Sequence, residues 1–84
     1  MNMVWYVYIA EFAKGNLYTG ITTDVTRRIR EHNDGIGAKS LRGKGPIKLL
    51  YFKKQSNKII ASRREKEIKG LTRSKKLNFL KGLP

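Results

Sequence analysis

The chain has 84 residues and no cysteine, and it carries 19 Lys and Arg against 6 Asp and Glu, which gives a formal net charge of +13. This length suits one domain, spanning 1–84, with a modest core, and the lack of cysteine excludes disulfides, thiolate catalysis and zinc-thiolate sites. No apolar run is long enough to cross a bilayer, and the N-terminus lacks a secretory signal, so we expect a cytoplasmic protein that does not enter membranes.

The charge excess favours nucleic acid as a partner. Each phosphate that a basic surface neutralises releases condensed counterions, so such a surface binds DNA or RNA strongly at low salt. Solubility and an anionic membrane surface are weaker explanations for a charge this large in a chain this short. With few carboxylates available, any hard cation must be held by one of the six acidic side chains, the lone histidine or the C-terminus.

Residues 3–11 and 17–22 are rich in aromatic and β-branched types, which predicts a β-hairpin. Its register decides whether Tyr8 and Tyr18 share a face of the sheet. A two-residue loop at 15–16 would place them on opposite faces, whereas a three-residue loop at 13–15 would place them on the same face. The three-residue loop fits better, because Gly15 suits its left-handed position.

A basic helix follows the hairpin. Asp24 can cap a helix that runs to about Asn33, and Gly35 comes after it as a stop signal. On this helix His32 continues the inward-facing apolar stripe, and Arg28 borders that stripe.

The next segment, 35–46, has four glycines and a proline and is predicted to be a mobile basic loop. We expect this loop and the preceding helix to contact phosphates. The residues that we assign to nucleic-acid binding are Lys39, Arg42 and Lys44 in the loop and Arg27 and Arg30 on the helix.

The remaining elements are a third strand at 47–53, a helix at 58–69 capped by Ser56 or Asn57, and a last helix that Thr72 caps and that ends near residue 81. The order β-β-α-β-α-α predicts a small α/β sandwich, in which a three-stranded, mostly antiparallel sheet is flanked by helices.

Several different short motifs follow one another along these elements. Val7-Tyr8-Ile9 and Tyr18-Thr19-Gly20 lie on the two hairpin strands, Arg28 follows ten residues after Tyr18, and Glu65 follows Ala61 by four residues. In this order and spacing the chain resembles the GIY-YIG nuclease superfamily, and in particular its small stand-alone bacterial members, which are related to the nuclease domain of the excision-repair endonuclease. The resemblance covers nearly the whole chain.

The resemblance implies a site that cuts phosphodiesters with one divalent ion, Mg²⁺ or Mn²⁺. Glu65 would hold the metal, and Tyr18 or Tyr8 would deprotonate the attacking water. Arg28 would bind a phosphate oxygen, and His32 would orient the water or accept a hydrogen bond from a tyrosine. A helical wheel alone does not separate Glu65 from Glu67.

The chain departs from the family pattern in three ways. Val7 stands where the first tripeptide has its glycine, and Asn78 is the nearest counterpart of an asparagine that often follows the metal glutamate. Larger members draw their specificity from additional domains. Without such a domain we expect little sequence preference, or a partner protein that supplies specificity.

Each motif residue also has a structural interpretation. Strand tyrosines usually pack, Tyr6 among them, an inward-facing histidine is often a satisfied core group, and Glu65 can pair with Lys69 one turn on. Our leading hypothesis is a metal-dependent endonuclease acting on structured or damaged DNA, as in DNA repair, with DNA favoured over RNA. The alternatives are a catalytically weak or inactive nucleic-acid-binding module with the same fold, and an adaptor for an acidic protein.

Overall fold

The computed structural model describes residues 4–13, 15–37, 39–41 and 45–81. Its elements, in chain order, are β1 (Trp5–Phe12), β2 (Asn16–Thr22), α1 (Val25–Asn33), a 3₁₀ helix (Lys39–Leu41), β3 (Lys48–Gln55), α2 (Lys58–Lys69) and α3 (Arg73–Lys81). This confirms the predicted α/β class and the order β-β-α-β-α-α. The three strands follow the order β2-β1-β3, and both pairings are antiparallel, so the sheet is antiparallel throughout.

The hairpin has the register that the three-residue loop predicts. Phe12 pairs with Asn16, which leaves 13–15 as the loop, and Gly15 has a φ of +95°. Glycine adopts this left-handed conformation without steric cost. Tyr8 and Tyr18 consequently lie on the same face of the sheet, with ring centroids 6.2 Å apart, as predicted.

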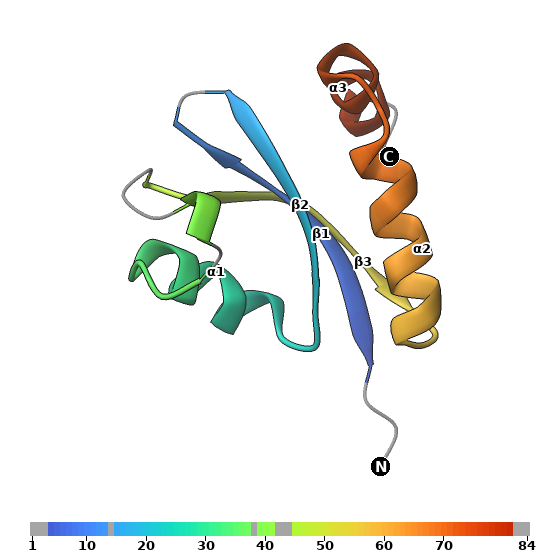
Figure 1. The fold of residues 1–84 in the computed structure, drawn as a ribbon, viewed down its shortest axis with the longest axis horizontal. Helices are drawn as coiled ribbons and strands as arrows, with labels where there is room; N and C mark the ends of the chain where they lie inside the picture. The colour runs from blue at the N-terminus through green and yellow to red at the C-terminus, as the bar shows by residue number, and fades with distance from the viewer. Residues whose placement is uncertain (1–3, 14, 38, 42–44, 82–84) are drawn as a thin grey trace.

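Helices cover both faces of the sheet: α1 lies on one side, and α2 and α3 lie on the other (Figure 1). The central strand β1 is buried on both faces, and its alternate residues enter two separate cores. The core on the α1 side contains Tyr8, Ala10, Leu41 and Ile47, with Ile29 packed against them. The core on the other side contains Val7, Ile9 and Ile68, with Phe79 and Leu80 packed against them.

Polar side chains begin the helices as the sequence predicts. Asp24 accepts a hydrogen bond of 3.0 Å from the backbone N–H three residues on, and so starts α1. Asn57, not Ser56, does the same for α2 at 3.0 Å, and the Thr72 hydroxyl does so for α3 at 3.2 Å. Such caps contribute typically about 1 kcal/mol each. No helix in the described part of the chain is long and apolar enough to span a membrane.

The segment 35–46, predicted as a mobile loop, is anchored to the fold at two described points. Its 3₁₀ helix places Leu41 in the core, where the side chain is 1% exposed. At its end, the Ile47 N–H donates to Asn33 Oδ1 at 2.8 Å, and Asn33 Nδ2 donates to the Ile47 carbonyl at 3.1 Å. Two of the predicted phosphate-binding residues, Arg42 and Lys44, lie outside the described residues.

Candidate active site

An aromatic cluster forms where β1, β2 and α1 meet. The rings of Tyr8, Tyr18 and His32 lie with centroids 6.2, 6.0 and 5.5 Å apart, so all three are in contact. The Tyr8 hydroxyl is 2.8 Å from His32 Nε2, at hydrogen-bond distance. Strand register brings the tyrosines together, and the helix places His32 over them, so residues 24 positions apart in the chain share one site.

Two glycines allow this close packing. Tyr8 pairs with Gly20 across the hairpin, and a Cβ at Gly20 would lie 2.6 Å from the Tyr8 hydroxyl oxygen. A Cβ at Gly37, in the segment after α1, would overlap Nδ1 of His32. Gly20 belongs to the second tyrosine tripeptide, which the sequence analysis singles out. Nothing local pointed to Gly37, because its contact with His32 depends on how the chain turns back after α1.

Burial sets the ionisation of this cluster. Tyr8 is 1% exposed, and desolvation, with the nearby Tyr18 adding to it, raises the pKa of Tyr8 to about 12 despite a hydrogen bond from Arg28 and its positive charge. Burial also lowers the pKa of His32, helped by Arg28 and opposed by Glu31. At neutral pH Tyr8 is therefore a neutral phenol and His32 a neutral imidazole.

Arg28 lies beside the cluster on α1, one turn before His32. Its Nη1 donates to Glu31 Oε1 at 3.1 Å, and its side chain is 33% exposed. Burial opposes the charge of the guanidinium, but hydrogen bonds to Glu31 and Tyr8 outweigh it and raise the pKa of Arg28. A partly exposed guanidinium that is held by Glu31 and lies beside Tyr8 is a suitable anion-binding group.

Glu65, on α2, is a carboxylate whose negative charge affects this cluster. It acts on the ionisation of Tyr8, although more weakly than burial, Tyr18 and Arg28 do. The Glu65 side chain is 21% exposed and lies 3.5 Å from Lys69 Nζ, whereas Glu67 is 63% exposed and pairs with Arg64. The structure therefore distinguishes two glutamates that the helical wheel does not.

The donor set for a cation is small. The described residues contain no group of three or more His, Asp or Glu side chains that could hold a metal ion. One carboxylate with partial access to solvent fits a hard cation that keeps most of its water ligands, as Mg²⁺ does. Glu65 is such a carboxylate, with the Lys69 ammonium as a competing partner.

A family model for the GIY-YIG catalytic domain matches residues 4–78. The chain belongs to the GIY-YIG family. GIY-YIG domains form a nuclease family whose members generally use a divalent metal ion, which confirms the resemblance seen in the motifs. The matched range contains both tyrosine tripeptides, Arg28, His32 and Glu65.

Relatives of this GIY-YIG chain are similar over most of their length. It is 53% identical over 76 residues to a UPF0213 protein of Haloquadratum walsbyi, covering 90% of this chain and 85% of that protein. It is 49% identical over 75 residues to a UPF0213 protein of Clostridium perfringens, covering 89% and 81%. The solution NMR structure of a UPF0213 protein from Bacillus halodurans superposes with a TM-score of 0.62 at 47% identity, covering 94% of this chain and 84% of that one.

The structure brings some of the predicted residues together and leaves others apart. Tyr8, Tyr18, Arg28 and His32 form one site, whereas Glu65 lies on α2, which covers the other face of the sheet, and acts on Tyr8 through its charge. The helix residues Arg27 and Arg30 are exposed on α1, and Lys39 is exposed on the 3₁₀ helix. These three cations lie on the surface of the GIY-YIG domain, outside the aromatic cluster.

Proposed function

We propose that this GIY-YIG chain is a metal-dependent endonuclease that hydrolyses phosphodiester bonds of structured or damaged DNA. The observation that carries the proposal is the convergence of Tyr8, Tyr18, His32 and Arg28 on one face of the sheet, with Tyr8 within hydrogen-bond distance of His32. Packing alone does not require a guanidinium beside three polar aromatic rings. The arrangement supports phosphate binding next to a group that can accept a proton.

The two tyrosines have different roles in this proposal. With a pKa of about 12 and almost no exposure, Tyr8 is too weak an acid and too inaccessible to supply a phenolate at neutral pH. Tyr18 is only partly buried and can reach solvent. Tyr18 is therefore the residue that takes the proton from the attacking water.

Tyr8 and His32 act as positioning residues. A guanidinium only donates hydrogen bonds, so the Tyr8 oxygen accepts from Arg28. In the tautomer of neutral His32 with its proton on Nδ1, the Tyr8 O–H donates to Nε2 at 2.8 Å. This chain of hydrogen bonds fixes the orientation of Arg28 and of the ring against which Tyr18 packs.

Arg28 binds the phosphate. Glu31 holds Nη1 at 3.1 Å and so fixes the plane of the guanidinium. A planar cation with several donors can contact a non-bridging oxygen and stabilise the extra negative charge of the pentacovalent transition state. A lysine at this position would supply charge without the fixed orientation.

Glu65 would hold the single Mg²⁺ or Mn²⁺ ion. When bound, such an ion acts as a Lewis acid on a phosphate oxygen and stabilises the leaving oxygen. The partial exposure of the Glu65 carboxylate is consistent with this role, and the ion would compete for it with Lys69 Nζ, which lies 3.5 Å away.

The substrate class follows from the distribution of charge. Exposed Arg27, Arg30 and Lys39 provide phosphate contacts, with Arg42 and Lys44 proposed for the same role, and phosphate contacts carry no base sequence information. We therefore propose that the shape of the DNA, or a partner protein, selects the substrate. DNA is proposed over RNA on the resemblance to the excision-repair nuclease domain.

The experiment is cleavage of a panel of linear, flapped and branched DNA and RNA with Mg²⁺ or Mn²⁺, comparing wild type, Glu65→Gln and Glu67→Gln. Glu67 is the matched control, because it lies on the same helix with its side chain 63% exposed. We expect metal-dependent cutting that is lost in Glu65→Gln and retained in Glu67→Gln, with DNA affinity retained in both variants.

Wild type that binds DNA in a gel shift but never cuts it would overturn the nuclease proposal and favour the binding module. Equal activity in the wild type and Glu65→Gln would overturn the assignment of Glu65 as the metal ligand.

A further inference from the structure

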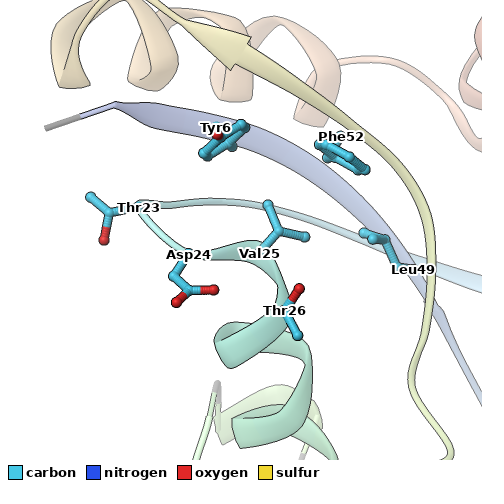
Figure 2. Close-up of a pocket in the computed structure, with 7 residues that line it drawn as sticks. All are labelled: Tyr6, Thr23, Asp24, Val25, Thr26, Leu49 and Phe52. Atoms are coloured by element: carbon cyan, nitrogen blue, oxygen red, sulfur yellow. The ribbon is translucent and has the colours of Figure 1, made fainter.

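A concave site lies on the same face of the sheet as the tyrosine cluster. It is a cavity of about 270 Å³, lined by Tyr6, Thr23, Asp24, Val25, Thr26, Leu49 and Phe52. Figure 2 shows the rings of Tyr6 and Phe52 above the start of α1, with Asp24 and Thr26 below them. The proposed chemistry uses none of these residues.

The cavity lies at the first residues of α1, before Arg28. Thr26, which lines the cavity, and Arg28, which faces the tyrosines, are two residues apart, and so their side chains are about 200° apart around the helix axis. A ligand in this cavity would therefore contact the β3 side of α1. It would add a second contact to the molecule without occupying the proposed active site.

The walls of the cavity are suited to a flat aromatic ligand. Tyr6 and Phe52 meet edge to face with ring centroids 6.1 Å apart, and Phe52 is 54% exposed, so a ligand can reach its ring from solvent. Ligand pockets are usually about 300–1,000 Å³, so this cavity suits one ring system and not a whole nucleotide.

The charged residues in and around the cavity indicate which part of a ligand it could hold. Asp24 lines the cavity, and its negative charge would repel a phosphate. Its Oδ1 caps α1, and the other carboxylate oxygen can accept a hydrogen bond from an exocyclic amino group. Cations lie on the elements that form its rim. Lys54 pairs with Tyr6 on the neighbouring strand and shares its face of the sheet, and Arg30 lies one turn after Thr26 on α1.

We propose that this cavity binds an unpaired nucleobase of the substrate, which stacks on Phe52 and Tyr6 while the adjoining phosphates contact Lys54 and Arg30. Bases stack on exposed aromatic side chains in proteins that hold single strands, and the net charge of +13 favours a nucleic acid as the occupant. This inference rests on the proposed function in taking nucleic acid as the ligand. It adds a site that recognises unpaired nucleotides.

The test measures binding without cleavage. A single-stranded oligonucleotide with one 2-aminopurine is titrated with protein in EDTA, and the same sequence is titrated as a duplex. Wild type should quench the fluorescence of the single strand by stacking. Phe52→Leu should abolish the quenching and weaken single-strand binding about five- to a hundredfold, with duplex affinity unchanged.

Two further variants complete the design. Phe52→Tyr keeps a ring and should bind as wild type does, which separates stacking from general apolar contact. Ile59→Ala is the matched control, because Ile59 is also a large exposed apolar residue but lies on α2, away from this cavity. It should leave quenching and affinity unchanged.

Unchanged quenching and affinity in Phe52→Leu would overturn the cavity as a nucleobase site, whether or not the protein cuts DNA. Conversely, a protein that shows the expected quenching but no metal-dependent cleavage would retain this inference and lose the proposed function.

Discussion

At the scale of single residues, the absence of a side chain at Gly20 determines where Tyr8 can lie. The Tyr8 ring crosses directly over this glycine, so its hydroxyl reaches His32 on the helix. The Tyr8 hydroxyl can therefore reach His32 only if the residue paired with Tyr8 on β2, Gly20, has no Cβ. Gly37 likewise leaves room for the His32 ring, because a Cβ there would overlap Nδ1.

We expect Gly20→Ala to displace the Tyr8 ring, because the new Cβ would lie 2.6 Å from its oxygen. Overpacking of this kind destabilises a protein by about 1–3 kcal/mol, and loss of the Tyr8–His32 hydrogen bond should lower cleavage at least tenfold. Urea unfolding and single-turnover cleavage measure the two effects. Gly70→Ala is the control, because its Cβ would meet nothing nearer than 3.4 Å. Wild-type stability and activity in Gly20→Ala would show that the close approach is unnecessary.

His32 should make stability depend on pH in a defined window. Its pKa is lowered in the folded state by burial and by Arg28, so the unfolded chain takes up a proton first as the pH falls. The contribution of neutral His32 is fully present above its ordinary pKa of about 6.5 and is lost as the pH falls through the folded value. Urea unfolding between pH 7.5 and 5 should show this loss in wild type and not in His32→Gln. The same slope in both proteins would contradict the prediction.

At the scale of elements, the amide of Asn33 joins the end of α1 to the start of β3. It pairs with both backbone groups of Ile47, as a neighbouring strand would. Leu41 anchors the intervening segment in the core. Lys39, exposed on the 3₁₀ helix, is therefore held in place by Asn33 before it and by Leu41 after it.

Asn33→Ala should leave the buried Ile47 N–H without its partner and cost about 1–3 kcal/mol of unfolding free energy. Hydrogen exchange at the Ile47 amide should become faster, and urea unfolding should show the loss. Asn78→Ala on α3 is the control, because that side chain is exposed and surface changes usually stay within about 0.5 kcal/mol. Unchanged exchange at Ile47 would show that the Asn33 side chain does not hold the segment.

Local signals predicted most elements, and long-range contacts were the part that the sequence did not reveal. The hairpin register followed from the glycine position, and the helix starts followed from Asp24, Asn57 and Thr72, because each depends on a few neighbouring residues. The burial of Leu41 and the contact of Gly37 with His32 were missed. Both depend on how a glycine-rich segment returns to the sheet, and no local pattern records that path.

At the scale of the whole molecule, most of the proposed chemistry lies on one face of the sheet. The α1 side carries the tyrosine cluster, Arg28 and the cavity lined by Tyr6 and Phe52, while the core on the α2 side is apolar. Glu65 is the exception, because it lies on α2. Motif spacing predicted that the tyrosines, Arg28 and His32 lie together, but it did not decide between Tyr8 and Tyr18. That distinction depends on burial, which the covering helix determines.

The most direct test of this account is single-turnover cleavage by Tyr18→Phe and Tyr51→Phe with saturating protein and Mg²⁺ or Mn²⁺. Tyr51 is the matched control, since it lies on β3 and packs on Phe79 on the opposite face, with ring centroids 5.3 Å apart. Loss of a group that transfers protons costs about 10²- to 10⁴-fold in rate. We predict such a loss in Tyr18→Phe with DNA affinity retained, and wild-type cleavage in Tyr51→Phe. Wild-type cleavage in Tyr18→Phe would contradict the account.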